Sequence, residues 1–313
     1  MNVNLLDVTA PVYLLIGLGY VAVRMSWFLP QQIVALGRYV IQFCVPAMLV
    51  RTLANVPIER AFQADFIGPY ALGSLMAMGA VLGLARICLR RPMSLAAIEA
   101  LGASTSNSMF IGFPVLQQLV GPPAALALAL VQVVENVLMI PLGLVLADAQ
   151  GGRSRRESFK LTVHSLTRNP LIVGIAAGLV LSAAGLTLPG PLDKGLGMFV
   201  GAAAPTSLFV IGGSLAGLKL EEMRVDVGLV AGGKLILHPL CVALALCFWH
   251  PEAPEMRSAA LVFAAVPMMS IYPALGQRHH HARLCAAALL AATLGSFITV
   301  NALIAVLSKL WFP

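Results

Sequence analysis

The sequence predicts an all-α polytopic membrane protein with ten transmembrane helices, arranged as two inverted five-helix repeats. Composition is the first indication: of 313 residues, 59% are hydrophobic and only 11% are charged, with a mean hydropathy of +0.90. Soluble domains carry about 25% charged residues. The other two indications are ten long apolar runs and a set of prolines that recurs at a fixed offset.

The apolar runs set the expected helices, because a spanning helix needs about 20 apolar residues. The predicted ranges are 8–24, 31–55, 67–89, 95–119, 123–147, 169–186, 191–216, 225–249, 257–277 and 282–309. The longest polar interval, 148–168, is the expected linker between a first repeat, 1–147, and a second repeat, 169–313. No Lys or Arg precedes the first run, so we expect a retained helix and not a cleaved signal.

Lys and Arg predict the orientation, since cytoplasmic loops carry the excess of both. Fourteen lie on the side that holds the linker, and five lie on the side of the termini: Arg51, Arg60, Lys194, Arg257 and Lys309. We therefore expect an inner-membrane protein with both termini on the periplasmic side. The net charge of +7 fits such loops, and no basic face suggests nucleic acid.

An offset of 159 residues superimposes five pairs of prolines without a gap. The pairs are Pro11 and Pro170, Pro30 and Pro189, Pro46 and Pro205, Pro92 and Pro251, and Pro114 and Pro273. Self-similarity at a fixed period indicates a duplicated unit. A unit of five spans must enter the membrane in the opposite direction the second time, which is the inverted repeat of secondary carriers.

Two of these prolines predict broken helices. In Ser104–Gly121, Gly112 and Pro114 are expected to end one half-helix and begin another, which leaves free amides at Val115 and Leu116. Pro273 and Ala274 are expected to do the same in the ninth helix. If the two breaks meet, two helix N-termini face one midplane pocket, an arrangement that favours an anion. The alternative is a proline kink that only shapes packing. Four small polar residues either line this pocket or allow close helix contact: Ser104, Thr105, Ser106 and Ser108.

Two charges lie deep in apolar runs, where an unpaired charge is costly. Lys234 is a candidate counter-ion for substrate, or else a structural partner of Glu135 or a residue that snorkels. Glu135, flanked by Gln132 and Asn136, is a candidate proton or sodium site, or else a buried protonated glutamate that holds helices together. We expect packing for His238 and no metal for the loop triplet His279–His281, because consecutive histidines do not share a face.

Three stretches resemble the auxin efflux carrier family: Asn107 to Pro114, Arg168-Asn169-Pro170, and Lys234 to Pro239. The resemblance implies a scaffold of helices 1, 2, 6 and 7 and a mobile domain of helices 3–5 and 8–10, with substrate at the crossing of helices 4 and 9. The short linker, the six-residue spacing of Pro267 and Pro273, and Tyr70 where the plant proteins have an aspartate favour the bacterial organic-acid branch.

The expected function is therefore secondary transport of a small organic anion, a carboxylate such as malonate or malate. The alternatives are a sodium-coupled symporter of related fold, an anion channel, and a membrane-embedded sensor. We expect no enzyme activity and no cofactor, a proton or sodium as the coupling ion, the bilayer as surroundings, and a homodimer through the scaffold as an option. The expected substrate residues are Asn107, Ser108, Gly112, Pro114, Val115, Leu116, Lys234, Pro267, Pro273 and Ala274.

Overall fold

A computed structural model describes residues 5–57, 63–149, 168–216, 225–277 and 279–310. This part of the chain is helical and contains no strand. Each of the ten predicted ranges corresponds to a helical segment, two of them with a non-helical break, and the ends agree with the prediction within three residues where described. Most of the predicted linker, residues 150–167, lies outside the described residues.

The first half contains five helical segments, several of them interrupted by a π-helical turn (η). They are α1 (Leu5–Arg24); α2 (Pro30–Tyr39), η1 (Val40–Cys44) and α3 (Val45–Ala54); α5 (Ala64–Gly83) and η2 (Leu84–Cys88); α6 (Met93–Ser104), η3 (Ser108–Gly112) and α7 (Phe113–Val120); and α8 (Pro123–Val133), η4 (Val134–Met139) and α9 (Ile140–Asp148).

The second half also contains five helical segments. Its elements are α11 (Pro170–Ala183); α12 (Gly190–Ala216); α13 (Val225–Gly232), η5 (Gly233–Leu237) and α14 (His238–Phe248); α15 (Pro254–Ala265) and α16 (Tyr272–Gln277); and α17 (Ala282–Leu310).

Within the described residues, six continuous helices, here called rods, are long and apolar enough to cross a membrane. They are Pro30–Ala54, Ala64–Cys88, Pro123–Asp148, Gly190–Ala216, Val225–Phe248 and Ala282–Leu307. Large apolar side chains on these rods face outward: Ile87 and Met198 are each 78% exposed, and Phe248 is 83% exposed. Such exposure is unfavourable in water and suits a lipid environment.

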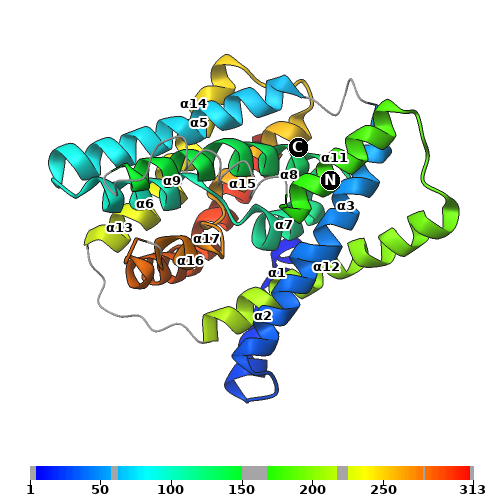
Figure 1. Cartoon of the computed structure of the whole chain (residues 1–313), viewed down its shortest axis with the longest axis horizontal. Coiled ribbons are helices and arrows are strands. Elements are labelled where there is room, and N and C mark those ends of the chain that lie inside the picture. Colours follow the sequence, from blue (N-terminus) through cyan, green and yellow to red (C-terminus); the bar gives the residue numbers. More distant parts are fainter. Residues whose placement is uncertain (1–4, 58–62, 150–167, 217–224, 278, 311–313) are drawn as a thin grey trace.

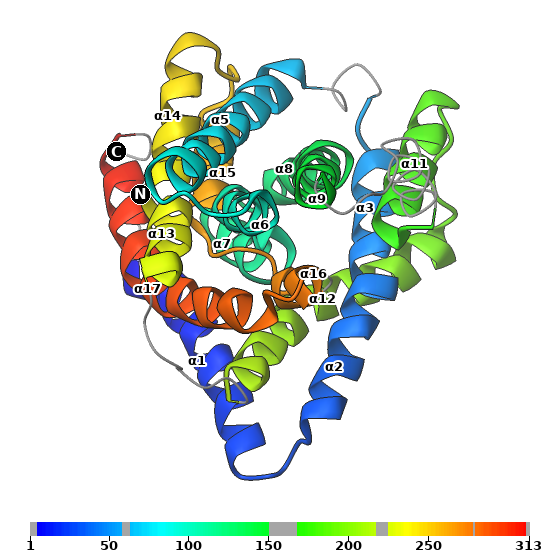
Figure 2. The same ribbon diagram turned by 60° about the vertical axis from the view of Figure 1, so that its left-hand side comes forward.

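The helices pack as two bundles (Figures 1 and 2). The small bundle comprises α1, α2, η1, α3, α11 and α12, and the large bundle comprises α5 to α9 and α13 to α17. In the small bundle α1 and α12 approach very closely, because a Cβ on Gly212 would collide with the carbonyl oxygen of Ile16 and one on Gly19 with that of Phe209. Glycine lets two helix backbones meet in this way.

The break in the fourth segment lies earlier than predicted. α6 ends at Ser104, Thr105 is extended (φ −118°, ψ 154°), and the next helix starts at Ser108 and runs through Pro114 to Val120. Gly112 and Pro114 therefore do not break the helix, and Val115 and Leu116 lie inside it and not at a free N-terminus.

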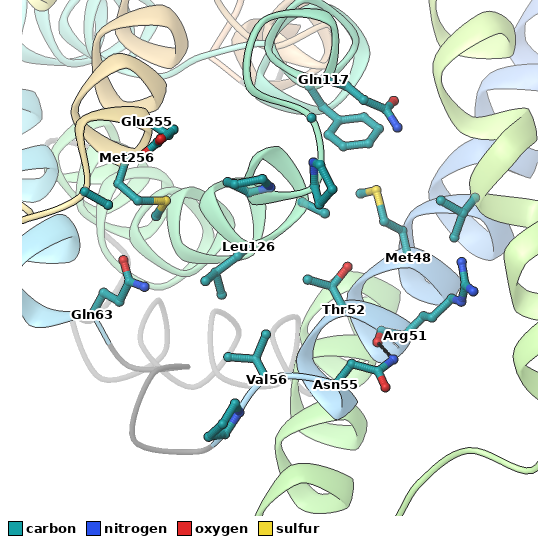
Figure 3. Close-up of a pocket in the computed structure, with 18 residues that line it drawn as sticks. Met48, Arg51, Thr52, Asn55, Val56, Gln63, Gln117, Leu126, Glu255 and Met256 are labelled. Atoms are coloured by element: carbon teal, nitrogen blue, oxygen red, sulfur yellow. Dashed lines mark hydrogen bonds between the residues drawn. The ribbon is translucent and has the colours of Figure 1, made fainter. Parts of the chain in front are cut away.

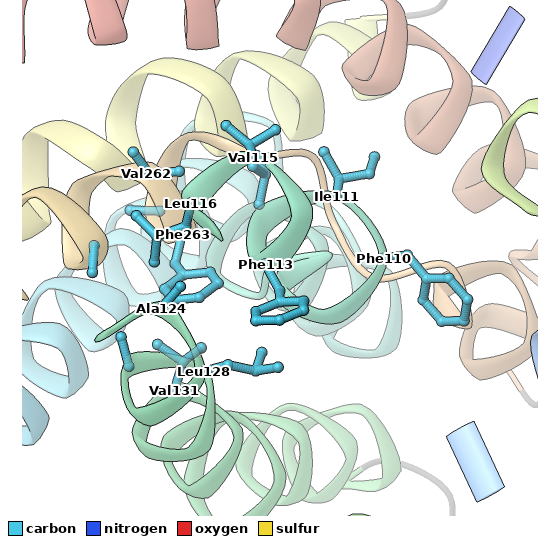
Figure 4. Packing of buried hydrophobic residues seen from close by; sticks show 14 of the residues in the cluster. Phe110, Ile111, Phe113, Val115, Leu116, Ala124, Leu128, Val131, Val262 and Phe263 are labelled. Atoms are coloured by element: carbon cyan, nitrogen blue, oxygen red, sulfur yellow. The ribbon is translucent and has the colours of Figure 1, made fainter. Parts of the chain in front are cut away.

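The polar run causes the break, because short polar side chains bind nearby backbone groups in place of the helical ladder. Ser104 Oγ donates to the Ala100 carbonyl (2.8 Å), and Thr105 Oγ1 donates to that of Leu101 (2.7 Å). Gly112 has another role: a Cβ there would lie 2.6 Å from Cδ1 of Phe263. Figure 4 shows the ring of Phe263 packed beside the α7 residues Phe113 and Leu116.

The break in the ninth segment lies close to its predicted place. α15 ends at Ala265, Val266 is extended (φ −70°, ψ 157°), and α16 begins at Tyr272. Pro267 therefore lies within the break, and Pro273 lies in the first turn of α16.

Candidate functional site

The two helix breaks meet at Asn107. Its backbone N–H donates to the carbonyl oxygen of Pro267 (2.7 Å), and its Nδ2 donates to Ser270 Oγ (2.8 Å). Its Oδ1 accepts the N–H of Phe110 (3.3 Å), which caps the helix that starts at Ser108. One side chain thus joins the fourth and ninth segments at their non-helical points.

A carboxylate lies against the start of this helix. Glu135 is 2% exposed; its Oε1 accepts the N–H of Ser106 (2.7 Å) and the hydroxyl of Tyr70 (3.3 Å), and its Oε2 accepts Ser108 Oγ (3.0 Å). Glu135 is placed by η4, and π-helical turns of this kind often occur at functional sites.

A buried ammonium lies on the other side of Ser106. Lys234, in η5, is fully buried, and its Nζ donates to Ser106 Oγ (2.8 Å), the Ala264 carbonyl (2.6 Å) and His238 Nδ1 (2.7 Å). Because an ammonium only donates, Nδ1 is the accepting nitrogen and Nε2 carries the hydrogen. Nε2 in turn donates to Ser74 Oγ (2.9 Å).

These two charges match the ends of the broken helices. The carboxylate of Glu135 faces the N-terminal end of η3, and the ammonium of Lys234 binds a carbonyl in the last turn of α15. Helix dipoles favour this arrangement. The charges are linked through Ser106, whose N–H binds Glu135 and whose Oγ binds Lys234.

A cavity of about 220 Å³ opens beside this network, between the two bundles. Its polar walls are Ser106, Asn107, Ser108, Gln132, Glu135, Asn136, Asn169 and Ser270. Asn169 comes from the small bundle and donates from Nδ2 to Asn136 Oδ1 of the large bundle (3.1 Å), while Asn136 Nδ2 binds Gln132. The apolar walls are Ile41, Met109, Phe110, Ile140, Leu171, Met269 and Ile271.

A second, larger cavity of about 930 Å³ lies toward the opposite ends of the same helices. Figure 3 shows Met48 and Arg51 of α3 on one side, with Gln63 and Met256 across the space. Arg51 is held by Asp193 of α12 through two hydrogen bonds, Nε to Oδ1 (2.6 Å) and Nη2 to Oδ2 (2.9 Å). Its charge is thus partly compensated within the small bundle.

The smaller cavity gathers only part of the expected site. Asn107, Ser108, Gln132, Glu135 and Asn136 line it. The other expected residues do not line it. Pro267 contacts Asn107 through its carbonyl oxygen, and Lys234 lies behind Ser106. The rest lie within helices: Gly112, Pro114, Val115 and Leu116 in the fourth segment, and Pro273 and Ala274 in α16. Lys234 therefore does not face the cavity as a counter-ion, because its three donors are taken by protein acceptors.

Two serines of the site, Ser74 and Ser270, were not selected from the sequence, and Tyr70 was noted only in comparison with the plant proteins. Ser106 belongs to the serine and threonine set that was expected either to line the pocket or to allow close helix contact. Single serines in apolar runs give no periodic signal. His238, expected to be a packing residue, is instead part of the Lys234 network.

The histidine loop lies apart from the cavity. His279 Nε2 is 3.7 Å from Asp148 Oδ1, and no group of three or more metal-ligating side chains occurs among the described residues. Burial, together with His279 and His280, lowers the pKa of His281.

Comparison with known proteins identifies the family. A family model described as "Membrane transport protein" matches residues 6–304. The chain belongs to this family of membrane transporters. It is 24% identical over 297 residues to the "Putative malonate transporter" of Rhizobium meliloti (strain 1021), with 94% of this chain and 93% of that protein covered. It is 23% identical over 299 residues to the "Uncharacterized transporter YfdV" of Escherichia coli (strain K12), with 92% and 93% covered.

Membership in the membrane transport protein family confirms the auxin efflux carrier resemblance. Together with the apolar rods, it makes the chain a multi-pass membrane transporter and not an enzyme. A transporter of this family handles a small molecule in a lipid environment, and the cavity between the bundles is its candidate site.

Proposed function

We propose that the protein is a secondary transporter that moves a small organic anion across the inner membrane. The substrate is a carboxylate such as malonate or malate, bound at the midplane where the two broken helices cross. The observation that carries the proposal is the cavity of about 220 Å³ at Asn107 and Ser270, walled by both bundles.

The size of the cavity supports a small substrate. Sites for drug-sized ligands run from about 300 to 1,000 Å³, so a cavity below that range suits a compact acid of a few carbons. Ser270 Oγ accepts a hydrogen bond from Asn107 Nδ2, which leaves the Ser270 hydroxyl hydrogen as a donor, and the side-chain amides of Asn107 and Asn169 each retain a second N–H. Such groups bind a carboxylate by hydrogen bonds.

The charge balance of the site also supports an anion. Glu135 is the one ionisable side chain among the described lining residues, and an isolated negative charge there would repel a carboxylate. Lys234 compensates it through Ser106. An incoming anion therefore meets a nearly neutral pair and the remaining hydroxyl and amide hydrogens of the cavity wall, which favours a weakly bound, releasable solute over a tight ion pair.

The arrangement of the helices supports alternating access. We propose ten spans in two inverted repeats, 1–147 and 169–313, with the small bundle as scaffold and the large bundle as the moving part. The cavity at their boundary then becomes accessible from each side in turn. Following the positive-inside rule, we propose that both termini and the larger cavity lie outside. Exposed apolar side chains of the small bundle, such as Met198 (78% exposed), support a homodimer through the scaffold.

The test is transport by the purified protein in proteoliposomes. We expect counterflow of labelled malonate or malate that exceeds that of a monocarboxylate such as acetate. Asn107→Ala and Ser270→Ala should reduce it, while Ser258→Ala should not; Ser258 is a buried serine in α15 that binds its own helix at Pro254 O and does not line the cavity. Absence of counterflow for every acid, or equal loss in Ser258→Ala, would refute the proposal.

A channel is distinguished in the same system. A carrier exchanges labelled for unlabelled acid and concentrates it against a gradient, and concentration collapses with an ionophore. Conductive flux without counterflow would assign a channel in place of a carrier.

A further inference from the structure

Glu99 is a buried carboxyl group with no hydrogen-bond partner. It lies on α6, its exposed fraction is 0%, and within the described part of the chain neither Oε1 nor Oε2 has a partner. Glu135, by contrast, has three donors. A buried carboxylate without donors is strongly disfavoured, and a bound proton removes the charge.

Buried apolar side chains pack at this part of α6, because Ile98, the residue before Glu99, belongs to a buried cluster with Val230 and Cys285. Arg91, two residues before the start of α6, forms an ion pair with Asp226 of α13. The side chain of Asp226 is 14% exposed, so this pair lies between Glu99 and the solvent on the side expected to be cytoplasmic.

Other titratable side chains also lie on the packed elements. They are Asp65 and Tyr70 on α5, Arg86 and Cys88 on η2, Asp148 on α9, Asp226 on α13, Lys234 on η5, Tyr272 on α16, and Arg283 and Cys285 on α17. None of them donates a hydrogen bond to Glu99.

One short segment connects Glu99 with the substrate cavity. Met269, Ser270 and Ile271 line the cavity, and the next residue, Tyr272, is fully buried beside α6. Its hydroxyl donates to the carbonyl oxygen of Ile98 (2.9 Å), the residue before Glu99. Its ring also rests on Gly102, where any Cβ would collide with it. A solute that shifts residues 269–271 therefore shifts the wall that covers Glu99.

We propose that Glu99 is the proton-binding site of this transporter, an inference that rests on the proposed carboxylate transport. One proton from water on the outer side binds the Glu99 carboxylate when an anion occupies the cavity. The carboxyl group crosses in its neutral form, and the proton leaves through the Asp226 side to water in the cytoplasm. Each cycle thus moves one proton with one anion, and no other reactant is needed.

The test uses proteoliposomes with the membrane potential clamped at zero and a pH-sensitive dye inside. One pH unit is worth about 1.4 kcal/mol per proton, or about tenfold accumulation. Wild type should accumulate malonate about tenfold per pH unit, with matching proton entry. Glu99→Gln should keep malonate counterflow but lose both accumulation and proton entry. The exposed control Glu252→Gln should behave as wild type.

The outcomes separate this proposal from the proposed function. Counterflow without pH-driven accumulation in wild type, or full accumulation in Glu99→Gln, refutes proton coupling at Glu99 and leaves carboxylate transport standing. Absence of counterflow in wild type refutes the transport of these acids itself.

A second readout does not need transport. The infrared C=O band of a protonated carboxyl group should be present in the purified wild type and in Glu252→Gln. It should be lost in Glu99→Gln and in Glu99→Leu, the latter an apolar variant that suits the surrounding cluster. A band that is absent at every pH, or that survives in both Glu99 variants, overturns the site whatever the transport result.

Discussion

Replacement of Lys234 by methionine tests whether the buried network holds the two helix breaks together. The ammonium is fully buried and donates three hydrogen bonds of 2.6–2.8 Å, to Ser106, His238 and Ala264. Methionine keeps much of the length and apolar volume and removes the charge and the donors. The change leaves the Ala264 carbonyl unpaired and Glu135 without a compensating cation.

The expected cost follows from what remains after the substitution. The sum of three charged hydrogen bonds, at about 1.5–3 kcal/mol each, overestimates the loss of folding free energy. The reason is that the variant no longer has to desolvate an ammonium group. Removal of one partner from a buried charge pair costs about 3–5 kcal/mol. The double variant Lys234→Met/Glu135→Gln removes both charges, so it should recover about 1–3 kcal/mol relative to the sum of the single changes.

The assay is thermal unfolding in detergent micelles. About 1 kcal/mol moves Tm by roughly 2–4 °C in a chain of 150–250 residues, so Lys234→Met should lower Tm by several degrees. Lys194→Met, an exposed lysine in α12, is the matched control and should leave Tm unchanged. A Tm equal to wild type in Lys234→Met, or additive single and double variants, would refute the network as a unit.

Two further predictions concern glycines. Gly212→Val should abolish the monodisperse protein peak in detergent chromatography, because the added Cβ collides with the Ile16 carbonyl. The control Gly201→Val has open space around its Cβ and should keep the peak. Equal yields of the two variants would contradict the close approach of α1 and α12. Gly112→Ala should cost about 1–3 kcal/mol by overpacking against Phe263 (2.6 Å from the added Cβ), and Phe263→Leu should relieve it. If the pair shows no relief, Gly112 serves another purpose.

The helices could be predicted from the sequence because long apolar runs leave few alternatives. The ends of all ten ranges agree within three residues where described. The break was predicted in the correct segment, the fourth. However, the predicted start of its second half-helix, Pro114, lies six residues after the observed start, Ser108. The prediction assigned the break to Gly112 and Pro114. The hydrogen bonds of Ser104 and Thr105 to their own helix show that the polar run Ser104–Ser108 causes it instead.

The site was predicted only where its residues stand out in the chain. Glu135 and Asn107 could be selected because a charge or a carboxamide inside an apolar run is rare. The link between Glu135 and Lys234 through Ser106 could not be predicted, because the contacts join segments 29 and 128 residues apart. Glu99 could not be selected from the sequence either. A glutamate near the start of an apolar run is expected to reach the membrane surface, and only the packing of the helices shows that this one is buried.

The most direct measurement of the central claim is a density map of the protein with bound malonate in lipid nanodiscs. The account predicts density for the acid in the cavity of about 220 Å³, within hydrogen-bond distance of Asn107, Asn136 or Ser270. Density in the larger cavity beside Arg51 and Gln117, with no acid at Asn107, would contradict it.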